Sequence, residues 1–256
     1  MNKYAILLII SILFLGLLEP FTTKEVYAAC PSEVSYEGQT YSTVEIGSQC
    51  WLGENLDVGE EIDSGDQTDN GTVEKYCYSN CNTYGGLYQW GEAMQYDNSE
   101  GAQGICPDGW HIPTKSEWNE LENNVCGDNG DEGSALAGRA DLWDGSYEIE
   151  EDDDFDCSGF EALPAGTCSD FWCVNQGYST DFWSSTESDS SNAWIREIAR
   201  GYTKFQEGTA GKDGSRSVRC VKNSDTVSRK GSEFQLASLV DALPELNEYL
   251  ENLLQE

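Results

Sequence analysis

The stretch at residues 106–122, CPDGWHIPTKSEWNELE, constrains the fold of this chain more than any other. Trp110 and Ile112 alternate with glycine and histidine, which is the pattern of a short, half-buried strand. Pro113 has no N–H group to donate to a central sheet ladder, so we expect the strand to end there. The stretch therefore begins as a strand that buries one tryptophan.

A helix is predicted directly after that strand. Thr114 and Glu117 have the spacing of a capping box, in which the threonine and glutamate side chains bind each other's backbone N–H groups. Trp118 and Leu121 lie three residues apart, so they share one face of the helix. The strand and the helix each contribute an aromatic side chain, and a single core can form around both.

Other elements follow from the same kind of pattern. Alternation or apolar content indicates six further strands, at 40–46, 50–52, 73–78, 182–183, 193–199 and 217–221. The apolar residues at 87–94 have the spacing of a short helix. Residues 57–71 are acidic and contain glycine, which is typical of a loop.

Residues 1–28 have the pattern of a secretory signal peptide. A short basic start precedes an apolar run at 4–18, and Val26-Tyr27-Ala28 forms a small-residue cleavage site. An uncleaved membrane anchor is the alternative, although the run is shorter than the roughly 20 residues of a spanning helix. Cleavage would leave Ala29 first, and a weak lipobox ending at Cys30 leaves a lipid anchor open. We therefore expect an extracellular or cell-surface protein.

The ten cysteines all follow this segment, and their even number indicates up to five disulfides in an oxidising compartment. Two pairs, Cys77 with Cys81 and Cys168 with Cys173, are close enough in sequence to close local loops. Zinc is the weaker interpretation, because no second close cysteine pair with matching histidines follows, and His111 is the single histidine.

The net charge of −33 restricts the partners of the chain. Loss of residues 1–28 removes two basic and two acidic residues, so the charge stays the same. Such a surface repels nucleic acid and anionic membranes. We expect no nucleic-acid partner, and membrane association only if Cys30 is lipidated. Divalent cations, basic partners or solubility alone remain as explanations of the charge.

Two acidic clusters lie in the polar region at 125–159, and they are the candidate metal site. Hard carboxylate oxygens suit Ca²⁺ at extracellular concentrations. Neither cluster follows the EF-hand pattern, so a solvated acidic loop is the competing interpretation. The candidate calcium ligands are Asp128, Asp131, Asp152 and Asp154. No other cofactor is expected.

Three aromatic residues in polar segments are candidate ligand-binding residues: Trp143, Phe171 and Trp172. Flat aromatic faces stack on other flat groups, including sugar rings, but they also pack onto protein cores. A catalytic site would need a nucleophile, a base and an orienting group. The cysteines are expected to be paired, and His111 lies in a predicted strand where a structural role is more common. We therefore expect no enzyme activity.

Six blocks of the chain, in order, resemble one protein family. In chain order they are residues 41–51 with 54–56, residues 84–90 with 93–94, the stretch at 106–122, and residues 160–166, 182–187 and 217–221. Together they span about 34–222 and resemble the Fibrobacter succinogenes major paralogous domain, a family of secreted bacterial proteins. The Pro-Thr-x-x-Glu-Trp and Val-Arg-Cys pieces also resemble those of C-type-lectin-like and formylglycine-generating-type domains.

The resemblance implies a fold over residues 29–222. That fold is α+β and C-type-lectin-like, rich in loops and stabilised by disulfides. In lectin-like folds the closing strand returns to the core sheet, which favours a bond between Cys106 and Cys220. The other expected pairs are Cys126 with Cys157, at the base of the acidic insertion at 125–159, and Cys30 with Cys50. Spacing alone leaves the connectivity open.

The chain changes character beyond residue 222. Residues 223–234 form a polar linker, and the leucines of residues 235–256 recur at helical spacing with acidic residues opposite. This pattern predicts a C-terminal amphipathic helix, which Pro244 kinks or restarts. The helix either docks on its own domain or binds a protein partner.

Fold analogy implies a secreted or cell-surface binding module without catalytic activity, whose ligand is a polysaccharide or a protein. Two alternatives remain open. One is an enzyme of the formylglycine-generating lineage that uses an unrecognised site. The other is a structural surface protein that docks through its C-terminal helix.

Overall fold

The computed structural model describes residues 30–222, with gaps at 64–65, 128–129, 146–147 and 170–171. The expected signal peptide, linker and C-terminal helix lie outside the described residues. Within them the protein is strand-rich and mixed, with several short helices and five disulfides. The lectin-like arrangement itself stays a prediction.

The first sheet contains the stretch at 106–122. Its five antiparallel strands lie in the order β1 (Glu33–Tyr36), β2 (Gln39–Ile46), β3 (Gln49–Leu52), β14 (Val221–Lys222) and β7 (Trp110–His111). The last strand of the described region thus pairs between an early strand and the central one, with Val221 opposite both Trp51 and His111. This pairing joins the two halves of the domain.

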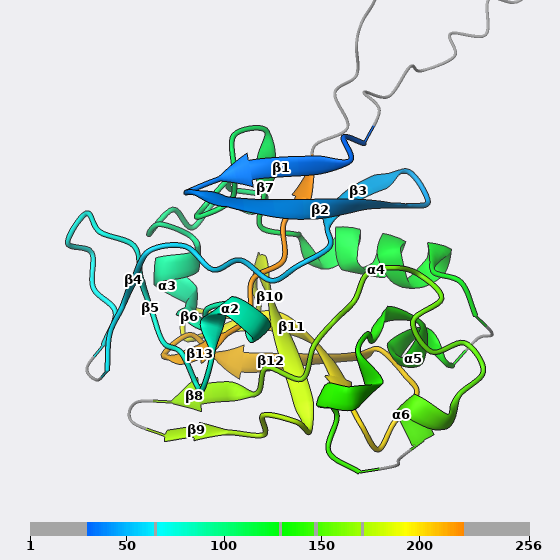
Figure 1. Cartoon of the computed structure of the whole chain (residues 1–256). Coiled ribbons are helices and arrows are strands. Elements are labelled where there is room, and N and C mark those ends of the chain that lie inside the picture. Colours follow the sequence, from blue (N-terminus) through cyan, green and yellow to red (C-terminus); the bar gives the residue numbers. More distant parts are fainter. Residues whose placement is uncertain (1–29, 64–65, 128–129, 146–147, 170–171, 223–256) are drawn as a thin grey trace, which may run out of the picture. The chain divides into compact units, whose positions relative to one another are not determined.

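Two more antiparallel sheets and one short parallel pair make up the rest of the strands in the described residues. One has the order β10 (Ser179–Glu187), β11 (Asn192–Ala199) and β12 (Gln206–Gly211). The other has the order β6 (Tyr88–Gln89), β13 (Gly214–Arg216), β8 (Thr167–Ser169) and β9 (Trp172–Val174). A short parallel pair joins β4 (Glu60–Glu61) to β5 (Glu74–Lys75). In Figure 1 the β8–β9 hairpin lies at the lower edge of the domain.

The helices are short apart from α4 (Lys115–Asn124). The others are α2 (Cys81–Tyr84), α3 (Trp90–Ala93), α5 (Glu132–Leu136), α6 (Glu148–Glu151) and the 3₁₀ helix η1 (Ala140–Leu142). The start of α4 has the expected capping box. Thr114 Oγ1 accepts from the Glu117 N–H at 3.1 Å, and Glu117 Oε2 accepts from the Thr114 N–H at 2.8 Å.

An aromatic cluster lies between α4 and the strands. The rings of Trp51 and Trp118 have centroids 4.7 Å apart, and Phe160, Phe182 and Phe205 surround Trp118. Each such ring pair contributes about 0.5–1.5 kcal/mol beyond the burial of apolar area. Both tryptophans belong to segments that the sequence pattern identifies as core-forming.

The same core contains a buried cation. Arg219 is fully buried, and its guanidinium donates to Asn55 Oδ1, to Leu52 O and to Phe160 O. It lies over the Phe160 ring at 4.1 Å. Burial lowers the pKa of Arg219 to about 9, while Glu54 and Glu161 favour its charge. Hydrogen bonds to neutral acceptors, rather than an ion pair, therefore hold this arginine in place.

The five disulfides have the pairing expected from the sequence: Cys30–Cys50, Cys77–Cys81, Cys106–Cys220, Cys126–Cys157 and Cys168–Cys173. No cysteine is free. The Cys106–Cys220 bond has the largest sequence separation, 114 residues, and it connects the start of the central stretch to the closing strand.

Several sequence expectations need correction. Residues 87–94 do not form one helix, because Tyr88 and Gln89 pair with β13 and the helix begins only at Trp90. The short loop that the Cys168–Cys173 disulfide closes lies within a hairpin of β8 and β9, which the sequence pattern did not indicate. The acidic segment at 125–159 does more than add a polar insertion. Its buried residues, which include Leu136 and Ile149, are part of the cluster around Trp118.

Candidate functional site

Trp172 on β9 is the most exposed large hydrophobic residue in the described part of the chain, with 77% of its surface accessible. Val174 lies two residues further on the same strand, so both side chains point to the same face, and it is 48% exposed. Thr167 and Ser169 are their register partners on β8. The hairpin thus presents a face with one flat aromatic ring beside small polar side chains.

Covalent and sheet contacts fix this hairpin. Cys168 and Cys173 are register partners as well as disulfide partners, with Cα atoms 4.0 Å apart. They point to the opposite face from Trp172, where they pack against Tyr76 and Leu87. On its other side β8 pairs with β13, with Ser215 opposite Cys168. Trp172 is therefore exposed on a paired strand that a disulfide joins to its neighbour.

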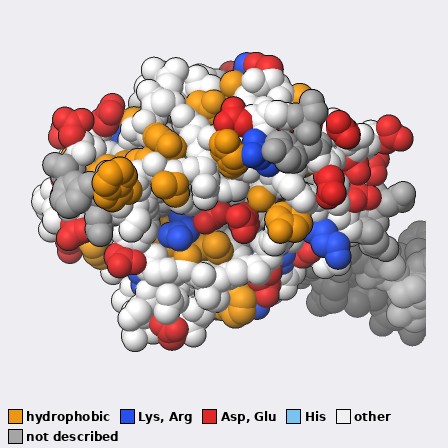
Figure 2. Space-filling model, turned by 90° about the horizontal axis from the view of Figure 1, so that it is seen from below, with side chains coloured by type: hydrophobic (Ala, Val, Ile, Leu, Met, Phe, Trp, Pro, Cys, Tyr) orange, Lys and Arg blue, Asp and Glu red, His pale blue; other side chains and the backbone are white. Residues whose placement is uncertain are grey.

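Figure 2 views the domain from below, the side on which Figure 1 places β8 and β9. Hydrophobic side chains reach the surface there among polar ones, and charges of both signs lie next to each other. A burial of one large aromatic side chain is worth roughly 1.5–3 kcal/mol. A ligand that covers the Trp172 ring would gain free energy of this order.

Three charged residues form a second feature on neighbouring strands. Asp181 on β10 and Glu197 on β11 are register partners, so their side chains share a face. The Nε atom of Arg216 on β13 donates to Asp181 Oδ2 at 3.2 Å, and its guanidinium lies over the Trp183 ring at 4.6 Å. These strands connect to the hairpin, since Gly166, just before β8, bridges to β10.

Burial dominates the electrostatics of this group. Asp181 is 9% exposed, and burial raises its pKa although Arg216 opposes the shift. Burial and the charge of Asp181 together raise the pKa of Glu197. Burial also lowers the pKa of Arg216. Arg216 thus pairs with Asp181 while Glu197 lies beside this pair, and such perturbed groups mark candidate functional sites as well as structural ion pairs.

The sequence pattern did not point to these three residues. The signal that could have found them is a charged residue at an interior strand position, such as Asp181 directly before Phe182-Trp183. Their meeting depends on the register between β10 and β11 and on the return of β13, which are both long-range features.

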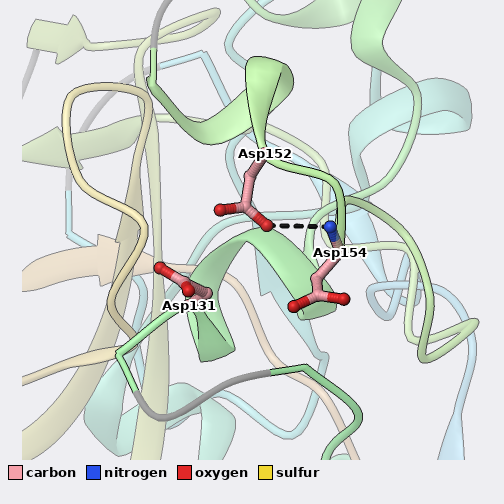
Figure 3. Close-up of side chains that lie close together, drawn as sticks. All are labelled: Asp131, Asp152 and Asp154. Atoms are coloured by element: carbon pink, nitrogen blue, oxygen red, sulfur yellow. Dashed lines mark hydrogen bonds between the residues drawn. The ribbon is translucent and has the colours of Figure 1, made fainter.

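Three of the four candidate calcium ligands meet in space. One carboxylate oxygen from each of Asp131, Asp152 and Asp154 lies within 4.8 Å of the others (Figure 3). Asp131 stands directly before α5, and the other two follow α6, where the Asp154 N–H donates to Asp152 Oδ1 at 2.8 Å. Asp128 lies outside the described residues.

The Cys126–Cys157 disulfide brings the ends of this acidic segment together, with Cα atoms 6.2 Å apart. Three carboxylates supply fewer oxygens than the six to eight that Ca²⁺ takes, so waters or carbonyl groups would complete its shell. Calcium binding by these residues stays a prediction.

The two remaining candidate ligand-binding residues are Trp143 and Phe171. Trp143 is 4% exposed, and its Nε1 donates to Gly138 O at 3.0 Å, so of the two roles open to it from the sequence its ring packs onto the core. Its apolar partners come from the core around Trp118, which lies far away in sequence. Phe171 lies outside the described residues.

His111 on β7 is buried against α4. Its Nε2 lies 2.8 Å from Glu117 Oε1, within the capping box of α4. Burial alone would raise the pKa of Glu117, but the hydrogen bond and charge of His111, with the Thr114 bonds, hold it below its ordinary value. The histidine thus ties the strand to the helix in the central stretch.

The sequence of this chain matches one known protein family. A model of the Fibrobacter succinogenes major domain (Fib_succ_major) matches residues 44–222, which is more than half of the chain. The chain belongs to this family. No curated protein and no solved structure matches it. In this member of the Fibrobacter succinogenes major domain family, the matched segment includes the β8–β9 hairpin, the Asp181 group and the three aspartates. No helix among the described residues is long and apolar enough to cross a membrane.

Proposed function

We propose that this protein is a non-catalytic binding module that works outside the cytoplasm, and that its ligand contacts the exposed face of the β8–β9 hairpin. Trp172 carries the proposal, because it is 77% exposed on a paired strand that a disulfide joins to its neighbour. Aromatic anchors that already have their bound orientation lose little entropy on binding, so they dominate many interfaces.

A neutral polysaccharide is the ligand that best fits this face. A flat ring can stack on a sugar ring, and Thr167 and Ser169 supply hydroxyl groups beside it for hydrogen bonds. The net charge of −33 disfavours polyanions, which include acidic polysaccharides and nucleic acid. A protein ligand that buries Trp172 is the second candidate.

The compartment and the fold class are part of the proposal. Ten cysteines in five disulfides support an oxidising environment, which fits export by the expected signal peptide. The closing strand β14 lies between β3 and β7, and the Cys106–Cys220 bond joins it to the central stretch. This return of the chain to its core sheet supports a C-type-lectin-like fold.

A glycan array tests the proposal. The purified protein is applied with and without calcium, beside the variants Trp172→Ala and Tyr202→Ala. Tyr202 is also strongly exposed, at 61%, but it belongs to the turn after β11, so it is a matched control for the loss of an exposed ring.

We expect the wild type and Tyr202→Ala to bind the same neutral glycans, and Trp172→Ala to lose them. A silent array for the wild type would remove the polysaccharide ligand. Equal binding by Trp172→Ala and the wild type would remove the hairpin as the binding face.

A further inference from the structure

A polar pocket of about 180 Å³ lies at a different place in the domain from the β8–β9 hairpin. Its walls come from β2, from the segment after β3, from α2 and from residues 161–163. Space of this size holds several water molecules. The pocket therefore has room for a small organic group and is much larger than a bare ion.

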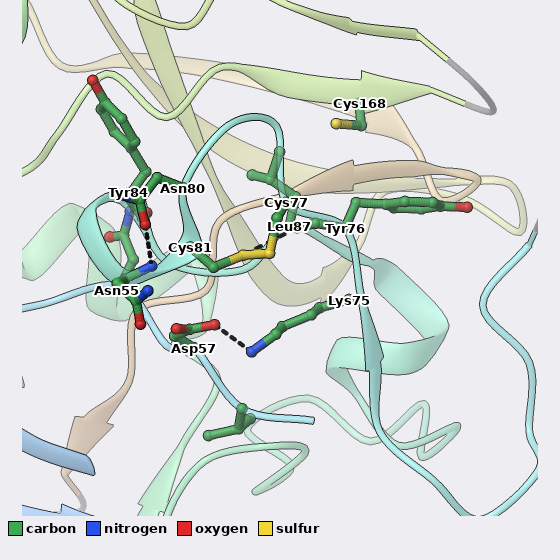
Figure 4. The surroundings of a disulfide bond; sticks show 12 residues. Asn55, Asp57, Lys75, Tyr76, Cys77, Asn80, Cys81, Tyr84, Leu87 and Cys168 are labelled. Carbon is green, nitrogen blue, oxygen red and sulfur yellow. Dashed lines mark hydrogen bonds and ion pairs between the residues drawn. A yellow bond between two sulfur atoms is a disulfide. The ribbon is translucent and has the colours of Figure 1, made fainter. Parts of the chain in front are cut away.

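The floor of the pocket is rigid. The Asn55 Nδ2 donates to Tyr84 O at 2.9 Å and to Ser217 Oγ at 3.3 Å, and its Oδ1 accepts from the buried Arg219. The Cys77–Cys81 disulfide lies beside this asparagine and fixes the start of α2 (Figure 4). Neither the amide nor the helix can move without breaking several of these bonds.

Three carboxylates line the pocket, and two of them are already engaged. Asp57 forms an ion pair with Lys75 (Figure 4), and it also accepts from Gln39 Nε2. Glu54 accepts from the N–H and the hydroxyl of Ser42, at 2.8 Å each. These bonds orient both acids.

The third carboxylate, Glu161, is held differently. Its side chain is exposed at the pocket, and its backbone has φ of +50°, which is rare for a residue with a side chain. Such strained positions gather at ligand-binding sites, because the surrounding structure must stabilise them. The neighbouring Arg139 is already engaged by both oxygens of Asp141, at 2.9 Å each.

The charges around the pocket do not balance. Three carboxylates (Glu54, Asp57 and Glu161) face two cations, Lys75 in the ion pair and Arg219 below the floor, so one negative charge remains. The engaged acids cannot turn to form a compact metal shell, and the excess charge repels anions. A singly charged cation of organic size would neutralise the site.

We propose that this pocket binds a small ligand through one protonated primary amine, with Glu161 as its counter-charge. Hydroxyl and amide groups at the rim, from Thr83 and Asn82 of α2, would contact the rest of the ligand. An amino sugar and a lysine side chain share this chemistry. The inference does not depend on Trp172 or on the polysaccharide proposal.

Two matched pairs of probes test it by calorimetry or by NMR titration of the purified protein. One pair is glucosamine against glucose, which differ in the charged amine. The other is Nα-acetyl-lysine amide against Nα-acetyl-norleucine amide. Binding of either amine, but not of its neutral partner, supports the proposal and identifies the carrier. Equal binding of an amine and its neutral partner, or no binding of either amine at millimolar concentration, overturns it.

Variants separate the pocket from the general acidity of the surface. Glu161→Gln should weaken amine binding about two- to fivefold, as expected for the loss of one exposed charge partner. Glu151→Gln, at an exposed position on α6, removes the same charge elsewhere and should have no effect. Equal weakening by both variants would overturn the proposal. Trp172→Ala should bind the amine normally, so failure of the hairpin proposal remains distinguishable.

Discussion

Removal of the Cys106–Cys220 disulfide should destabilise the domain more than removal of any short-loop disulfide. The bond closes a loop of 114 residues, and the loss of loop-closure entropy from the unfolded chain is worth about 5 kcal/mol at 25 °C for that length. The Cys77–Cys81 bond spans only 4 residues, for which the same relation yields about 2 kcal/mol. The difference of about 3 kcal/mol depends only on the two loop lengths.

The double variants Cys106→Ala/Cys220→Ala and Cys77→Ala/Cys81→Ala measure that difference. Both members of the long-range pair are fully buried, so the lost sulfur atoms add a packing loss in the same direction. For a domain of this size, about 5 kcal/mol corresponds to a fall in Tm of roughly 10–20 °C, against roughly 4–8 °C for the control.

Equilibrium unfolding in urea, with circular dichroism as the signal, provides the free energies directly. Equal losses in the two double variants would refute the reasoning, because loop length would then not decide the stabilisation. A long-range variant as stable as the wild type would further show that the closing strand does not need its covalent link.

Three further outcomes follow from the structure. Because burial and the charge of Asp181 raise the pKa of Glu197, the domain loses stability as the pH rises through that folded pKa. Glu197→Gln should therefore stabilise the domain at pH 7 and have no effect near pH 3 in urea titrations. Millimolar calcium should raise the Tm of the wild type but not of Asp152→Asn, and an unchanged Tm would remove the site. Thr114→Ala should lower the free energy of unfolding by about 1 kcal/mol through loss of the α4 cap, and an unaltered urea midpoint would contradict this.

Local patterns in the sequence were enough to predict the central stretch. The capping box depends on two residues three positions apart, and the short disulfides depend on cysteines four or five positions apart. Physical distance follows from sequence distance in such cases. Residues 87–94 show the limit, because Tyr88 joins a sheet only through β13, more than 100 residues later.

The candidate site was predictable only in part, for the same reason. Trp143 and Trp172 both stand in polar segments, and nothing local separates the buried ring from the exposed one. Trp143 is buried because the core around Trp118 reaches it, whereas β9 is an edge strand that presents Trp172 to solvent. Asp181 and Glu197 meet through strand register, which single-sequence patterns do not encode.

The dissociation constants of a glycan selected on the array, measured by calorimetry for the wild type, Trp172→Ala and Tyr202→Ala, test the central claim most directly. An anchor residue contributes about 2 kcal/mol or more, so we expect binding to Trp172→Ala to weaken about 30-fold. Binding to Tyr202→Ala should match the wild type. Equal dissociation constants for all three proteins would contradict the claim that the β8–β9 hairpin is the binding face.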